Sequence, residues 1–88
     1  MIQVTERARE TFKNKLDELF EDPGVMLRIG HTDSGLGVFP DTEADDDQII
    51  EHDGRGVLLI DREISETLAD TIIDVEEHPD GARFVVRR

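Results

Sequence analysis

Three histidines are the imidazole donors of the chain, and their positions decide whether they could bind a metal ion. The surrounding patterns place His31 at a strand end, His52 before a turn and His78 within a turn. This spacing matches no metal-binding motif. If His31 and Asp33 met His52 across a sheet, imidazole and carboxylate ligands could hold ferrous iron or zinc weakly. The alternative, which the spacing favours, is that the histidines are surface polar residues.

A dense group of carboxylates could attract a hard cation: Asp41, Glu43, Asp45, Asp46 and Asp47. An EF-hand loop needs glycine at its sixth position and glutamate at its twelfth. Counted from Asp41, these positions hold Asp46 and His52. The segment is therefore predicted to be a solvated, mobile acidic loop rather than a calcium site.

Ser34 near His31 is the one pair that could suggest a nucleophile and a base, but no oxyanion hole or substrate cleft can be assigned to it. The small residues around it lack the spacing of a phosphate-binding loop. We therefore assign no catalytic residue, no cofactor and no metal ligand, and we expect the protein not to be an enzyme.

The composition excludes several classes of protein. With 22 acidic and 10 basic residues the formal net charge is -12, which repels nucleic acid phosphates and anionic lipids. Because cysteine is absent, there is no disulfide, no CxxC pair and no thiolate cluster site. No apolar run approaches the roughly 20 residues of a membrane span, and no signal sequence is visible. We expect a cytoplasmic protein without nucleic acid or membrane partners.

The length of 88 residues predicts a single domain over residues 1–88. A chain of this size buries only about 60–65% of its unfolded surface. A partner subunit would add to so thin a core, and a homodimer is a reasonable expectation.

A long helix is predicted over residues 6–20, with Thr5 as its N-cap. Its apolar residues recur at helical spacing and predict one buried stripe: Ala8, Phe12, Leu16, Leu19 and Phe20. The sequence Asp22-Pro23-Gly24 ends it.

The rest of the chain is predicted to be mainly strands. Alternation over residues 25–31 predicts a strand, residues 32–37 a loop, and Val38 with Phe39 the start of a strand that Pro40 curtails. An acidic connector over residues 41–48 leads into a hairpin over residues 49–60 with its turn at residues 53–56. Asp61 caps a short helix ending near Ala69 or Asp70, and a second hairpin turns at residues 78–81.

Five short stretches carry a family resemblance in their order and spacing: residues 2–8, 25–30, 33–37, 53–57 and 81–84. Asp33-Ser34-Gly35-Leu36-Gly37 looks like an S-G-C-[SG]-G loop, and Gly81-Ala82-Arg83-Phe84 resembles a G-x-x-F strand. Together they resemble the A-type iron-sulfur carrier (HesB-like) proteins over nearly the whole chain. The resemblance implies an α+β, mainly β fold: a buckled mixed β-sheet, or HesB-like pseudobarrel, with one long N-terminal helix and one short helix.

Typical members of that family bind a cluster or iron through three cysteines. Here Leu36 stands where the first is expected, and because the chain ends at Arg88 we expect no C-G-C tail to supply the other two. Leucine offers no donor, whereas iron-sulfur clusters need thiolates or occasionally imidazoles. We carry none of the family's ligands over to this chain.

The resemblance implies a non-catalytic role associated with iron-sulfur cluster assembly, without cluster ligation through cysteine. The expected partners are assembly or target proteins. Leu36 is expected to pack inward or against a partner subunit. The expected contact surface is the segment in place of the ligand loop: Thr32, Asp33, Ser34, Gly35, Leu36, Gly37, Val38 and Phe39. The alternative function is weak binding of iron or zinc by histidines and carboxylates.

Overall fold

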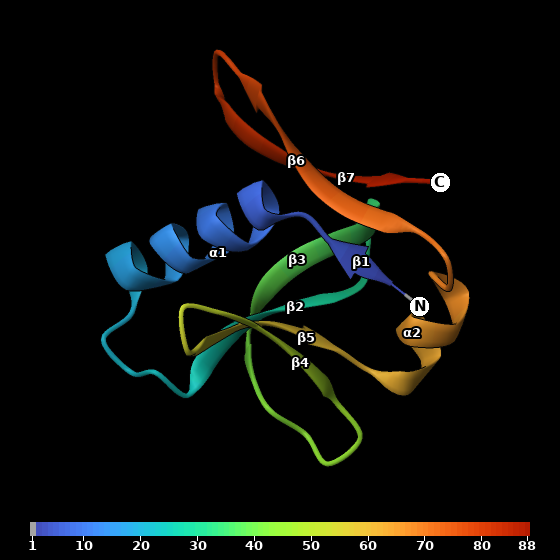
Figure 1. Cartoon of the computed structure of the whole chain (residues 1–88), viewed down its shortest axis with the longest axis horizontal. Helices are drawn as coiled ribbons and strands as arrows, with labels where there is room; N and C mark the ends of the chain where they lie inside the picture. The colour runs from blue at the N-terminus through green and yellow to red at the C-terminus, as the bar shows by residue number, and fades with distance from the viewer. Residues whose placement is uncertain (1) are drawn as a thin grey trace.

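The computed structural model describes residues 2–88, which form two open β-sheets and two helices (Figure 1). Met1, where the predicted domain begins, lies outside the described residues. In chain order the elements are β1 (Gln3–Val4), α1 (Glu6–Leu19), β2 (Val25–Thr32), β3 (Gly35–Thr42), β4 (Gln48–His52), β5 (Arg55–Ile60), α2 (Arg62–Thr67), β6 (Ile72–His78) and β7 (Gly81–Arg87).

Both sheets are mixed. The three-stranded sheet has the order β1-β6-β7 and the four-stranded sheet the order β3-β2-β5-β4. The pairs β1-β6 and β2-β5 are parallel, and the remaining pairs are antiparallel. The expected α+β, mainly β fold class is confirmed, with the mixed β-structure divided between two sheets that do not close into a barrel.

Helix α1 confirms the predicted N-terminal helix. The Thr5 hydroxyl accepts a hydrogen bond from the Ala8 amide at 3.1 Å, which satisfies one of the open amides of the first turn. Ala8, Phe12 and Leu16 are buried. Leu19, predicted to share their stripe, is instead 58% exposed. Leu16, three residues earlier, is fully buried, so the buried stripe of α1 ends there and Leu19 does not continue it.

The core lies where α1 meets both sheets. The helix packs against β2, β4 and β5 of the four-stranded sheet and against β6 of the other (Figure 1). Its buried side chains meet Leu27 and Ile29 of β2, Leu58 of β5 and Ile73 of β6. Burying each such side chain contributes about 1.5–3 kcal/mol before conformational entropy is subtracted.

The two predicted hairpins are confirmed as β4-β5 and β6-β7. At the β4-β5 turn, Asp53 and Gly54 both have positive φ, as the tight turn between right-twisted strands requires. Asp61 accepts a hydrogen bond from the Ile64 amide at 2.8 Å and caps α2. This helix ends at Thr67, earlier than predicted.

The prediction for residues 32–40 is wrong in two respects. β2 continues through Thr32 and β3 starts at Gly35, so only Asp33 and Ser34 connect them. Pro40 does not curtail β3, which runs through it to Thr42. β3 is the edge of its sheet, and on an edge strand a missing amide can face outward, where no partner strand needs it.

Candidate functional site

The predicted contact segment, residues 32–39, is an ordered β-hairpin rather than a loop. At its tip the Thr32 hydroxyl donates to the Gly35 carbonyl at 2.8 Å and accepts from the Ser34 amide at 3.2 Å. Gly35 has φ 106°, a conformation that a residue with a side chain rarely adopts. The exposed tip is therefore held by local hydrogen bonds and a required glycine.

Side chains of the hairpin alternate between the two faces of the sheet. Leu36 and Val38 are partly buried and pack against the core. Leu36 lies opposite His31 of β2 and packs inward, as expected. Phe39 points to the other face, where its ring would lie 3.0 Å from a Cβ at Gly30. The segment thus has an exposed polar tip, whereas the apolar side chains of its two strands pack within the molecule.

The acidic connector is not a freely solvated loop, because its last carboxylate, that of Asp47, is tied to the sheet. Asp47 accepts two hydrogen bonds from the Arg28 guanidinium, from Nη1 to Oδ1 at 2.7 Å and from Nη2 to Oδ2 at 2.5 Å. Arg28 Nε also donates to Asp41 at 2.6 Å. The side chains of Arg28 and Asp47 are only 11% and 1% exposed. Hydrogen bonds from Arg28 lower the pKa of the Asp47 carboxyl.

The ion pair was not among the sequence-based predictions. Arg28 interrupts the apolar run from Val25 to Ile29, and a charge in such a run usually has a buried partner. That signal points to Arg28 but does not reveal which of the neighbouring carboxylates is the partner.

A second carboxylate that the sequence patterns did not single out joins the start of α1 to β6. Asp74 accepts hydrogen bonds from Arg7 Nη2 at 2.7 Å, from the Thr5 hydroxyl at 2.8 Å and from the Val75 amide at 2.8 Å. These bonds, that from Arg7 above all, lower the pKa of Asp74 far below its ordinary value. The network fixes the start of α1 to the three-stranded sheet.

The histidines do not converge on a metal site. Strands β2 and β5 are parallel, and Ile29, two residues before His31, pairs with Ile60 at the end of β5. His52 of β4 pairs with Arg55 at the start of β5, so it lies at the opposite end of the sheet. The His31–Asp33–His52 arrangement considered from the sequence is therefore not formed. Within residues 2–88 no group of three or more histidines and carboxylates is placed to hold a metal ion.

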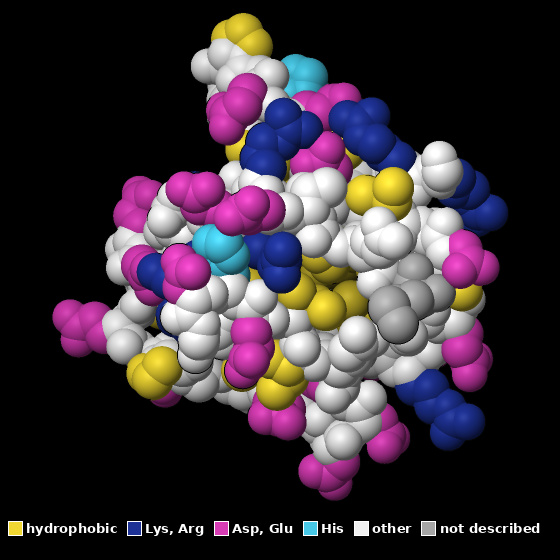
Figure 2. Space-filling model, viewed as in Figure 1, with side chains coloured by type: hydrophobic (Ala, Val, Ile, Leu, Met, Phe, Trp, Pro, Cys, Tyr) yellow, Lys and Arg dark blue, Asp and Glu magenta, His cyan; other side chains and the backbone are white. Residues whose placement is uncertain are grey.

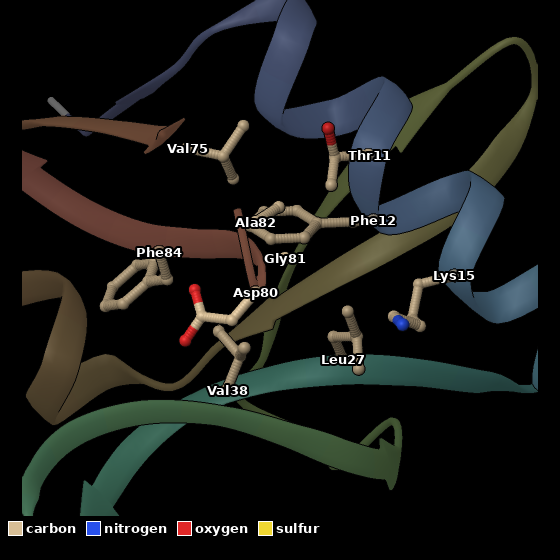
Figure 3. A pocket seen from close by; sticks show the side chains of 10 residues that line it. All are labelled: Thr11, Phe12, Lys15, Leu27, Val38, Val75, Asp80, Gly81, Ala82 and Phe84. Atoms are coloured by element: carbon tan, nitrogen blue, oxygen red, sulfur yellow. The ribbon is translucent and has the colours of Figure 1, made fainter. Parts of the chain in front are cut away.

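A pocket of about 270 Å³ lies between α1, strands β2 and β3 of the four-stranded sheet, and the β6-β7 hairpin (Figure 3). Lys15 stands at its edge, one turn along α1 from Thr11. Asp80 lines it from the hairpin tip and pairs with Arg83 at 3.0 Å. Its apolar walls are Phe12, Leu27, Val38, Val75 and Phe84. This pocket was not expected from the sequence, because it forms between segments far apart in the chain.

Charge on the surface is distributed unevenly. Figure 2 shows carboxylates around much of the visible face, while several basic side chains gather over the β6-β7 hairpin. Most cations are paired with carboxylates of the same chain, including Arg7 with Asp74, Lys13 with Asp17 and Arg87 with Glu76. The charge left for partners to meet is therefore mostly negative. No helix in residues 2–88 is long and apolar enough to cross a membrane.

The fold is that of proteins of iron-sulfur cluster biosynthesis. It is similar to Escherichia coli SufA, involved in biosynthesis of iron-sulfur clusters, with a TM-score of 0.76 and 21% identity over 99% of this chain and 84% of that one. A protein from Aquifex aeolicus gives a TM-score of 0.72 at 26% identity, covering 99% and 90% of the two chains. IscA, solved with a [2Fe-2S] cluster, gives 0.64 at 14% identity, covering 100% and 85%.

Sequence relatives carry the assignment further. The chain is 34% identical over 83 residues to the iron-sulfur cluster insertion protein ErpA of Pseudomonas aeruginosa, covering 84% of this chain and 71% of that protein. To the ErpA of Stutzerimonas stutzeri it is 32% identical over 92 residues, covering 98% and 78%. No protein-family model matches the chain. The chain belongs to the A-type iron-sulfur carrier family, as its resemblance to HesB-like proteins predicted.

Proposed function

We propose that the protein is a cytoplasmic, single-domain, non-catalytic interaction module of iron-sulfur cluster assembly, which holds no cluster through its own side chains. The observation that carries the proposal is the side chain at residue 36. Typical members of the family have a cysteine there, whereas this chain has a leucine that packs against the core, and none of its 88 residues is a cysteine. Without thiolates, the soft donors that clusters require are missing.

The proposed contact surface is the hairpin formed by residues 32–39. Its two-residue turn is fixed by hydrogen bonds before a partner arrives, so little conformational entropy is lost on binding. Asp33 at the tip is exposed and makes no side-chain hydrogen bond or ion pair within residues 2–88. The partners that fit the family are a cluster-donating scaffold and apo forms of iron-sulfur target proteins.

Cluster ligation is tested by anaerobic reconstitution with ferrous iron and sulfide, with an ErpA relative as the positive control. We expect no visible iron-sulfur absorbance and no inorganic sulfide retained after gel filtration, because hard carboxylates and scattered imidazoles do not replace thiolates. A brown protein with stoichiometric sulfide would refute the proposal.

Partner binding is tested with two charge reversals of equal size. Asp33→Lys changes the hairpin tip, and Asp46→Lys makes the same change in the acidic connector, also at an exposed residue. Binding to a scaffold and to an apo target protein of the same organism is measured by calorimetry. We expect Asp33→Lys to weaken binding about tenfold and Asp46→Lys to change it much less. Equal effects of the two variants would mean that the hairpin is not the contact surface.

A further inference from the structure

The pocket between α1 and the two sheets reaches down to the core. Phe12, Leu27 and Val75 line it and are at most 7% exposed. Val38 and Phe84, which are partly buried, also line it. These side chains come from α1, β2, β3, β6 and β7, so the hollow results from the way in which the helix and the sheets meet (Figure 3). Mostly apolar walls with a few polar groups are typical of binding sites for small molecules.

Three of the lining residues have polar side chains, and two of these already have partners. The Thr11 hydroxyl donates to the Arg7 carbonyl at 2.9 Å. The Asp80 carboxylate accepts from the Arg83 guanidinium at 3.0 Å. Lys15 is exposed, and its side chain makes no hydrogen bond or ion pair within residues 2–88. The charge that remains available at the pocket is therefore positive.

The size and the layout of the pocket restrict what it can hold. Lys15 and Asp80 stand at opposite sides of the apolar walls, so a negative group bound at Lys15 does not lie against the Asp80 carboxylate (Figure 3). The volume of about 270 Å³ equals that of about nine water molecules in the liquid, at roughly 30 Å³ each. A ligand of about ten non-hydrogen atoms, with an apolar body and one negative group, matches both the volume and the charge.

We propose that the pocket binds a small aliphatic carboxylic acid of about eight carbons, such as octanoate. Its hydrocarbon chain lies between the apolar walls, and its carboxylate pairs with the Lys15 ammonium. The exposed tip of the β2-β3 hairpin, Asp33 and Ser34, does not line this pocket. Acid binding is therefore a function beyond the contact surface proposed above, and its test needs no partner protein.

Binding is expected to be weak and to depend on the length of the acid. The net charge of -12 repels an anion at long range, although about 0.1 M salt screens this repulsion beyond about 10 Å. A ligand of about ten non-hydrogen atoms is expected to bind with a Kd of about 0.1–1 mM. Each methylene taken out of water strengthens binding about fourfold, so hexanoate should bind about tenfold more weakly than octanoate.

NMR titration of the isotope-labelled chain with octanoate, hexanoate and octylammonium, in about 0.1 M NaCl, tests the proposal. We expect octanoate to shift the amide signals of Thr11, Lys15 and Ala82 saturably. Octylammonium has the same chain length and the opposite charge, and we expect it to bind at these residues several-fold more weakly. The proposal is overturned if these amides show no saturable shift up to about 10 mM octanoate, or if octylammonium binds there as tightly.

The ion pair with Lys15 is tested by two matched charge deletions. Lys15→Gln removes the ammonium at the pocket, whereas Lys13→Gln removes one that pairs with Asp17 and does not line the pocket. Both variants remove one positive charge, so they change the long-range repulsion equally. We expect Lys15→Gln to weaken octanoate binding about fivefold and Lys13→Gln to weaken it less than about twofold. Equal effects of the two variants overturn the proposal.

The apolar part of the site is tested by filling it. Ala82 is exposed and lines the pocket from the edge strand β7, so Ala82→Phe adds a ring at the pocket outside the packed core. Ala69→Phe adds the same ring at an exposed alanine that does not line the pocket. We expect Ala82→Phe to weaken octanoate binding at least about tenfold and Ala69→Phe to leave it within about twofold, with both variants folded by circular dichroism. Octanoate binding that survives Ala82→Phe unchanged overturns the proposal.

Discussion

Arg28 and Asp47 form an ion pair with little access to water. Removing one partner of such a pair destabilises the fold, because the other charge stays buried without a partner. The Asp47 carboxylate accepts from both terminal nitrogens of Arg28 and from the Ala44 amide, so it also shapes the connector. Asp47→Asn keeps the shape but removes the charge. We expect it to lower the free energy of unfolding by about 1–3 kcal/mol in urea titrations. Asp41→Asn, at a carboxylate 44% exposed, should cost less; an equal loss would contradict the deeper placement of Asp47.

Asp74 makes stability depend on pH in a defined direction. Its pKa is lower in the folded than in the unfolded chain because Arg7, Thr5 and Val75 donate to the carboxylate. Its contribution is therefore complete above the unfolded pKa of about 4 and is lost as pH falls toward the lower folded pKa. We expect Asp74→Asn to be less stable than the parent at pH 7, and the difference to shrink from pH 4 to pH 2. A difference independent of pH would rule out this linkage.

Among the elements, the β2-β3 hairpin depends on a single glycine. Gly35 has φ 106°, and no atom lies within 4 Å of the place that a Cβ would take, so the cost of a side chain there comes from the backbone alone. We expect Gly35→Ala to destabilise the protein by about 1 kcal/mol, measured by thermal unfolding. Ser34→Ala, one residue earlier and with no strained φ, should stay within about 0.5 kcal/mol of the parent. Equal effects of the two variants would argue against backbone strain as the cause.

Elements with local signals were predictable, and those set by distant pairing were not. Thr5 caps α1, and Asp53-Gly54 forms the tight turn of the β4-β5 hairpin, so both follow from a few adjacent residues. The extension of β3 through Pro40 depends on its edge position, which emerges only when the strand order is known. The candidate site divides in the same way. The absence of cysteine was visible in the sequence, whereas the pocket and the Arg28–Asp47 pair are formed by segments that are separated in the sequence and meet only in the folded chain.

At the scale of the whole molecule, electrostatic repulsion opposes folding. The net charge is -12, because 22 carboxylates outnumber the ten lysines and arginines, most of which are already paired within the chain. Exposed charges of this kind are screened over about 10 Å at 0.1 M salt and about 3 Å at 1 M salt. Exposed ion pairs lose strength on the same change, but each contributes little. Screening of the repulsion should therefore dominate.

We expect the melting temperature to rise by about 5 °C between 0.1 M and 1 M NaCl, which corresponds to roughly 1 kcal/mol for a chain of this size. The measurement is made by circular dichroism at low protein concentration, where association does not add to stability. A variant with Glu10→Gln, Glu43→Gln and Asp45→Asn, all at exposed residues, has a net charge three units smaller. It should start from a higher melting temperature and respond less to salt, because less repulsion remains to be screened. A melting temperature that falls with salt in both proteins would show instead that the ion pairs outweigh the repulsion.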